Sequence, residues 1–102
     1  MINVLISCSG GFSSSLVISK FKEAAKKGNI EVNAWAINSG DYDDNVNKAD
    51  IVLVAPQIRY MYPRFKEKAD KLGIPCIMVS QEDYGRCNGQ HILETVLEEL
   101  KK

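Results

Sequence analysis

Residues 2–15 decide the fold: Ile2-Asn3-Val4-Leu5-Ile6-Ser7-Cys8-Ser9-Gly10-Gly11-Phe12-Ser13-Ser14-Ser15. The stretch from Ile2 to Ile6 is a short apolar run, which indicates a buried strand. A turn rich in glycine and serine follows it, and a helical pattern begins after the turn. A buried strand that leads through a Gly/Ser turn into a helix is typical of the first unit of a parallel α/β sheet.

The helical pattern from Leu16 onward has its apolar residues at positions i, i+4, i+7 and i+8, which are Val17, Phe21, Ala24 and Ala25. Lysines and Glu23 occupy the other positions, so the pattern predicts an amphipathic helix. Ser13 or Ser14 is the predicted N-cap, and Gly28 is the predicted stop.

Three further apolar runs indicate strands, and they cover residues 30–37, 51–55 and 74–79. The polar segment 41–48 is expected to be a loop or a short surface helix. A helix is predicted over residues 58–72, with Pro63 in its first turn and Gly73 at its end. A closing helix is predicted over residues 92–100, with Asn88 as its cap.

Near-continuous hydrophobic strands that alternate with helices require a parallel sheet buried on both faces. We therefore predict a single α/β domain over residues 1–102, a small doubly wound flavodoxin-like fold. Its four-stranded sheet is expected in the order 2-1-3-4, with helices on both faces. Ligands of such folds bind beyond the carboxyl ends of the strands, where the strand order reverses. The predicted first strand reaches that edge at Ser7 and Cys8.

Composition narrows the classes of function. Thirteen Lys and Arg residues balance thirteen Asp and Glu residues, so the formal net charge is zero. This balance argues against nucleic acid or an acidic membrane surface as the main partner. No apolar stretch approaches the ~20 residues that cross a bilayer, and no signal-peptide pattern is present, so we expect a cytoplasmic protein. Three cysteines and a lone histidine lack metal-ligand spacing, and we expect neither a metal nor a cofactor.

The segment from Cys8 to Ser15 combines three features that suit an anion. Consecutive glycines allow backbone N–H groups to turn inward, the following helix contributes its positive end, and the serines offer hydroxyl donors. The same groups would stabilise a thiolate at Cys8, which makes Cys8 a candidate nucleophile over a phosphate-shaped site. The plain structural alternative is an ordinary strand-to-helix turn with Cys8 as a small buried residue.

Related chemistries leave two other functions open. Protein-tyrosine phosphatases place an Arg six residues after the cysteine, where it clamps the phosphoryl group, but here that position holds Ser14. A phosphatase-like thiol hydrolase is therefore a weaker alternative than a carrier that holds a phosphoryl group without hydrolysing it. An FMN-binding module is the other alternative, although 102 residues leave little room for loops around a flavin.

Across nearly the whole chain, the sequence resembles the IIB component of the lactose/cellobiose (chitobiose) group of the bacterial sugar phosphotransferase system. The matching pieces are residues 4–15, residues 52–61 and the triplet Asp83-Tyr84-Gly85. The resemblance implies a phosphotransferase in which Cys8 receives a phosphoryl group from a phosphohistidine of the IIA protein. Cys8 would then pass the group to a β-glucoside or oligosaccharide held by the membrane component IIC. The phosphate would be held by the loop residues Ser9, Gly10, Gly11, Phe12, Ser13, Ser14 and Ser15.

Other residues have less definite roles. Gln57 and Arg59 follow the predicted third strand, and Asp83 and Tyr84 follow the fourth, so these four are candidate contacts at the rim or with a partner. Cys76 is expected to be an inert core residue and Cys87 an incidental thiol. His91 is expected at the surface or in a helix cap.

Nothing in the sequence identifies the sugar, because the resemblance implies that IIC holds it. We expect a monomer. The sequence leaves open whether the chain is naturally separate or fused to other components, and Met1 directly before the first strand favours a separate chain.

Overall fold

The computed structural model describes residues 1–8 and 12–101 and has the predicted α/β architecture. Its strands are all parallel and form one four-stranded sheet in the order β2-β1-β3-β4, as predicted. The strands are β1 (Ile2–Cys8), β2 (Val32–Asn38), β3 (Ile51–Val54) and β4 (Cys76–Met78). The α-helices are α1 (Phe12–Lys27), α2 (Tyr42–Asn45), α3 (Tyr62–Lys71), α4 (Gln81–Gly85) and α5 (Gly89–Leu100). The 3-10 helices are η1 (Ser39–Asp41), η2 (Val46–Lys48) and η3 (Pro56–Met61).

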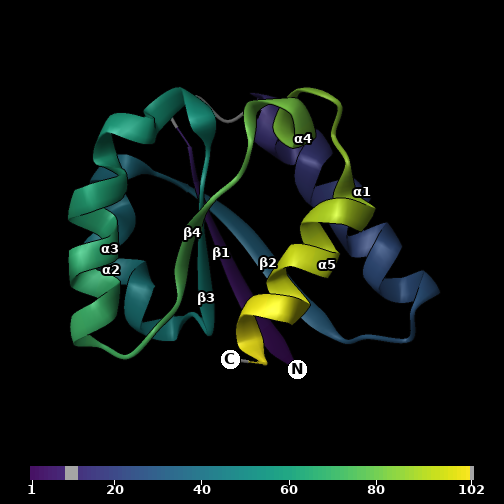
Figure 1. The fold of residues 1–102 in the computed structure, drawn as a ribbon, viewed down its shortest axis with the longest axis horizontal. Coiled ribbons are helices and arrows are strands. Elements are labelled where there is room, and N and C mark those ends of the chain that lie inside the picture. Colours follow the sequence, from purple (N-terminus) through teal and green to yellow (C-terminus); the bar gives the residue numbers. More distant parts are fainter. Residues whose placement is uncertain (9–11, 102) are drawn as a thin grey trace.

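The molecule has three layers, with α1 and α5 on one side of the sheet and α2 and α3 on the other (Figure 1). The two central strands are apolar on both faces, because helices cover them on both sides. Val4, Leu5 and Ile6 of β1 and all four residues of β3 are at most 1% exposed. This buried centre fixes the register of β1 against its neighbours, so the carboxyl ends of β1 and β3 lie side by side.

Helix α1 begins at Phe12, which is earlier than predicted. Ser13 and Ser14 therefore lie inside its first turn, and the prediction that one of them caps the helix is wrong. The serines instead contribute backbone N–H groups to the four that have no partner within a helix at its start. At the other end, Gly28 is the first residue after the helix, and the left-handed residue is Asn29 with φ 57°.

β2 and β4 each begin two residues later than predicted. β2 begins at Val32 because the N–H of Ile30 donates to the carbonyl of Ala25 at 2.9 Å and closes the turn after α1. β4 is limited to Cys76–Met78, since Pro75 has no N–H for the ladder and Val79 leads into the next turn. Hydrogen bonds between β3 and the residues flanking β4 continue the contact: Val52 donates to Pro75, and Val79 donates to Val54.

The segment predicted as a loop or short surface helix, residues 41–48, forms α2 and η2 and is partly buried. Tyr42 is 2% exposed and Val46 is fully buried. The Tyr42 ring stacks on Phe65 of α3 with ring centroids 3.9 Å apart, and its hydroxyl donates to the Phe65 carbonyl at 2.7 Å. Burial raises the pKa of the Tyr42 hydroxyl, so it stays a neutral donor. This contact holds the segment to α3.

Candidate functional site

Cys8 is the last residue of β1 and is 3% exposed. It lies opposite Asn38 at the end of β2. On the other side, the carbonyl of its neighbour Ser7 accepts a hydrogen bond of 2.9 Å from the N–H of Ala55, just after β3. The strand order reverses between β2 and β3 around β1, so Cys8 lies at the switch point where α/β folds bind ligands.

Helix α1 begins four residues after Cys8, and Ser9, Gly10 and Gly11 between them lie outside the described residues. Its first four residues, Phe12 to Ser15, carry the N–H groups that an anion beside Cys8 would meet. No acidic residue lies in the first turn, and Lys26 and Lys27 lie in the last, so the charge distribution of α1 matches its dipole. The end of α1 near Cys8 therefore favours negative charge.

Ser7 is fully buried, and among the described residues its hydroxyl has no hydrogen-bond partner. Side chains alternate between the two faces of a strand, so Ser7 and Cys8 point to opposite faces of the sheet. The free hydroxyl is therefore directed away from the thiol and contributes no donor to it.

Gln57 and Arg59 lie in η3, directly after β3, and both are exposed. They come from the same end of the sheet as Cys8. Tyr60 beside them is 72% exposed, and Leu16 near the start of α1 is 53% exposed. Large apolar side chains with this exposure near the carboxyl ends of the strands are candidates for a protein contact.

Asp83 and Tyr84 lie in α4, a short helix that the sequence analysis did not predict. The side chain of Asp83 is 16% exposed, and its Oδ2 lies 2.6 Å from Nδ1 of His91 in α5. Tyr84 is 2% exposed and packs in the core. The backbone N–H of His91 donates to the side chain of Asn88, which confirms Asn88 as the cap of α5.

The other two cysteines differ in their surroundings. Cys76 is 3% exposed, and burial raises the pKa of its thiol to about 12, so it stays protonated. Cys87 is half-buried, in the turn between α4 and α5, with φ 53°. Within residues 1–8 and 12–101, no group of three or more His, Cys, Asp or Glu side chains is placed to hold a metal ion.

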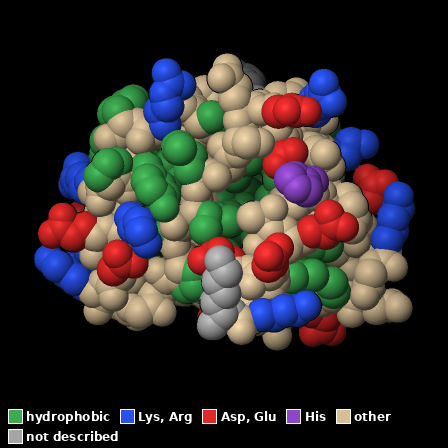
Figure 2. Space-filling model, in the orientation of Figure 1, with side chains coloured by type: hydrophobic (Ala, Val, Ile, Leu, Met, Phe, Trp, Pro, Cys, Tyr) green, Lys and Arg blue, Asp and Glu red, His purple; other side chains and the backbone are tan. Residues whose placement is uncertain are grey.

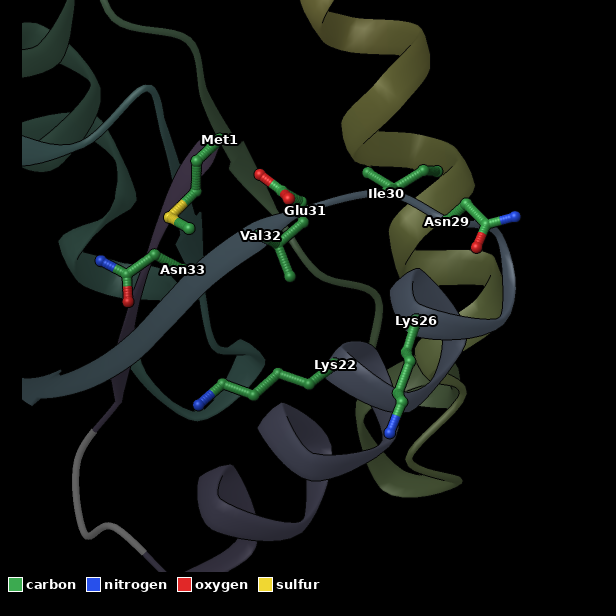
Figure 3. A pocket seen from close by; sticks show the side chains of 8 residues that line it. All are labelled: Met1, Lys22, Lys26, Asn29, Ile30, Glu31, Val32 and Asn33. Atoms are coloured by element: carbon green, nitrogen blue, oxygen red, sulfur yellow. The ribbon is translucent and has the colours of Figure 1, made fainter.

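A pocket of about 560 Å³ lies at the end of the sheet opposite Cys8 (Figure 3). Val32 and Asn33 line it from β2, Met1 lines it just before β1, and Lys22 and Lys26 line it from α1. It is at the amino ends of β1 and β2, so it is separate from Cys8. In the described part of the chain, no helix combines the length and the apolar character needed to cross a membrane.

Comparison with known proteins shows the family of the chain. The family model "PTS system, Lactose/Cellobiose specific IIB subunit" matches residues 3–95. The chain belongs to this family. The IIB chain is 31% identical to the oligo-beta-mannoside-specific EIIB component of Bacillus subtilis (strain 168), and the match covers 95% of this chain and 94% of the relative. It is 28% identical to the cellobiose-specific EIIB component of Lactococcus lactis subsp. lactis (strain IL1403), over 88% of each chain.

Solved structures give the same result for the IIB fold. The lactose-specific IIB domain of Streptococcus pneumoniae superposes with a TM-score of 0.86 at 27% identity, over 96% of each chain. The cellobiose-specific IIB protein of Borrelia burgdorferi superposes with a TM-score of 0.81 at 31% identity, over 98% of this chain and 92% of the other. The predicted family and fold are therefore confirmed.

IIB components work with the membrane component IIC, and in some relatives the two are joined. The lactose-specific EIICB component of Staphylococcus aureus is 29% identical over 97% of this chain, which spans only 18% of that longer protein.

Proposed function

We propose that Cys8 is the phosphoryl acceptor and donor of this IIB subunit. The Cys8 thiolate attacks the phosphorus of a phosphohistidine on the IIA protein, an S–P bond forms, and the histidine nitrogen leaves with the electron pair of the P–N bond. A hydroxyl of the sugar held by IIC then attacks the same phosphorus. The S–P bond breaks, Cys8 leaves as a thiolate, and the hydroxyl proton passes to a base. The transfer is a phosphotransferase reaction from phosphocysteine to sugar.

The observation that carries this proposal is the position of Cys8. It ends a central strand at the switch point and directly precedes the Gly/Ser segment that leads into α1. A phosphoryl dianion on its sulfur would lie beside the helix N-terminus, where N–H groups and the dipole favour negative charge. Phosphoryl transfer needs mainly such positioning and charge stabilisation, which a small domain can supply.

The absence of arginine from residues 9–15 suits a carrier. An arginine there would stabilise the transition state for attack by water as well as by the acceptor. Phosphocysteine without that clamp should persist until a partner supplies a hydroxyl. This favours a carrier over a phosphatase-like hydrolase.

The sugar is proposed to be of the β-glucoside or oligosaccharide class, such as cellobiose, chitobiose or lactose, and the cellobiose-specific and lactose-specific relatives support this class. Gln57, Arg59, Tyr60 and Leu16 are the proposed contacts for IIA, because they are exposed around the carboxyl ends of the strands. We expect the protein to act as a cytoplasmic monomer, so that Cys8 can meet each partner in turn.

The test is the intact mass of the protein after incubation with phosphorylated IIA. One phosphoryl group should add to the wild type and to Cys87→Ser, and none should add to Cys8→Ser. A mass gain that persists in Cys8→Ser would refute the assignment. Rapid turnover of an aryl phosphate that depends on Cys8 would instead indicate the hydrolase.

A further inference from the structure

A second site lies beside the edge strand β4. It is a pocket of about 240 Å³ between β4 and the first half of α5. Its apolar lining consists of Leu53, Ile77, Met78, Val79 and Ile92. Cavities of about 150 Å³ accept a benzene-sized molecule, so this pocket has room for one large apolar side chain.

The mouth of the pocket is held in shape by hydrogen bonds between helices. Asp83 of α4 and His91 of α5 line the mouth and contact one another at 2.6 Å. The N–H of Asp83 also donates to Ser80 Oγ at 3.1 Å, which caps α4 at its start. A preformed apolar cavity with a few fixed polar groups at its mouth is the usual form of a binding site.

The surface around this mouth is acidic, although the whole chain is neutral. Five acidic residues and one basic residue, Arg86, lie between Ser80 and Leu100. The acidic residues are Glu82, Asp83, Glu94, Glu98 and Glu99. Arg86 lies 3.4 Å from Glu82, so these two charges offset one another and the other four carboxylates remain. Figure 2 shows the single histidine at the border of a hollow with acidic side chains gathered around it.

Two observations extend this charge toward the pocket. His91, Thr95 and Glu98 follow one another at i, i+4 and i+7, so Glu98 continues the row of α5 residues that lines the mouth. Glu94 is three residues after His91, so it lies next to the same row, and it is exposed. The mouth therefore presents net negative charge to a partner.

We propose that this pocket seats a cytoplasmic loop of the membrane component IIC, a segment with one apolar anchor side chain and flanking Lys or Arg residues. Cytoplasmic loops of membrane proteins carry an excess of Lys and Arg, which complements the acidic rim. Phosphorylated IIA would bring a dianion and is repelled by the same charge. The proposal rests on the proposed function and specifies how IIC is recognised.

The position of the pocket suits transfer to IIC. It lies toward the carboxyl end of β4, and β4 is separated from β1 by β3 alone. Neighbouring strands are about 4.8 Å apart, so β4 is roughly 10 Å from the strand that ends at Cys8. A loop anchored there would bring the bound sugar to the same edge of the sheet as the phosphoryl group.

The experiment uses inverted membrane vesicles that contain a lactose/cellobiose-type IIC, its sugar and the phosphorylated protein. The variant E94K/E98K is compared with E31K/E67K, which changes the net charge equally at exposed positions away from the pocket. The KM of IIC for the phosphorylated protein should rise about tenfold in E94K/E98K, with kcat and the rate of phosphorylation by IIA within twofold of the wild type. E31K/E67K should leave both steps within twofold.

A second pair of variants tests the cavity. T95W should cover the mouth and raise the same KM, whereas Q90W, at an exposed position on the same helix outside this pocket, should not. Equal KM values for each variant and its control would overturn the proposal. Slower phosphorylation by IIA with an unchanged IIC step would also overturn it, because it would assign the surface to the donor. If the wild type accepts no phosphoryl group from IIA, the proposed function itself fails before the vesicle step is measured.

Discussion

Cys8 and Cys76 are both strand residues and both 3% exposed, yet they lie at opposite ends of their strands. Cys76 begins β4, and its surroundings raise the pKa of its thiol to about 12, chiefly through burial. The charge of Lys66 opposes this shift, and that of Asp70 adds to it. Cys8 ends β1 and leads into α1. Under the proposed function, equal burial would accompany different chemistry, because helix N-termini gather only at the carboxyl ends of parallel strands.

The largest expected effect is on the rate of phosphoryl transfer, which should distinguish Cys8 from Cys76. Cys8→Ala should lower phosphoryl transfer from IIA to sugar about a thousandfold or more, because no nucleophile remains. Cys76→Ala should leave the rate within about twofold, since a buried neutral thiol takes no part. A coupled assay with phosphorylated IIA and IIC vesicles measures both. Loss of transfer in a folded Cys76→Ala protein would contradict the comparison.

The stability of the layer beside the sheet depends on how closely α5 packs against α1. A Cβ on Gly89 would lie 2.3 Å from the carbonyl carbon of Lys20, so Gly89→Ala must push α5 away from α1. We expect the free energy of unfolding to fall by about 3 kcal/mol, as measured by urea denaturation. Gly85→Ala is the matched control, because a Cβ there meets nothing within 4 Å. Equal stability of the two variants would show that the helices can separate without cost.

The thiol of Cys76, at the amino end of β4, should make the free energy of unfolding depend on pH in alkaline solution. The pKa of Cys76 is about 12 in the folded state against an ordinary value of 9.0, so the unfolded chain loses this proton first as the pH rises. The corresponding stability is fully present below pH 9 and is lost as the pH rises toward 12, at up to about 1.4 kcal/mol per pH unit. Urea unfolding at a series of pH values should show this slope.

Cys76→Ala should flatten the alkaline slope without removing it. Tyr42 also has a raised pKa from burial and contributes in the same direction. An unchanged slope in Cys76→Ala would mean that the thiol has the same pKa in the folded and unfolded chains.

The smallest expected effect is a loss of stability at the amino ends of the strands. Asp50 accepts hydrogen bonds from the backbone and side-chain N–H groups of Asn3, at 2.8 Å and 3.2 Å. Because these bonds are exposed, Asp50→Ala should cost about 1 kcal/mol in thermal or urea unfolding and leave the transfer rate unchanged. Asp44→Ala, at another exposed carboxylate, should cost less. A slower transfer in Asp50→Ala would mean that the two ends of the sheet are coupled.

Most of the fold could be predicted because its signals are local. The apolar run of β3 and the period of α1 identify their own elements, and the right-handed crossover rule then gives the strand order. The segment 41–48 could not be predicted in the same way. Its two buried residues, Tyr42 and Val46, are covered by partners elsewhere in the sequence, such as Phe65.

In the candidate site too, features with a local sequence signal could be predicted, and contacts between distant residues could not. Cys8 could be proposed from its neighbours, since a cysteine before a Gly/Ser turn and a helix is a local pattern. The contact between Asp83 and His91 could not be found, because it joins two helices across a turn and follows no helical spacing. The need for glycine at position 89 could not be predicted from the sequence either, because it comes from the backbone of Lys20, which leaves no room for a Cβ there.

The hydrogen bond from Trp35 Nε1 to Asn45 Oδ1, at 3.3 Å, gives the protein an intrinsic optical reporter. Trp35 is the sole tryptophan of the chain, and the bond ties β2 to the end of α2. Its emission should therefore shift when α2 comes away from the sheet. Fluorescence could follow that local event during docking or unfolding without a label and without a change at either thiol.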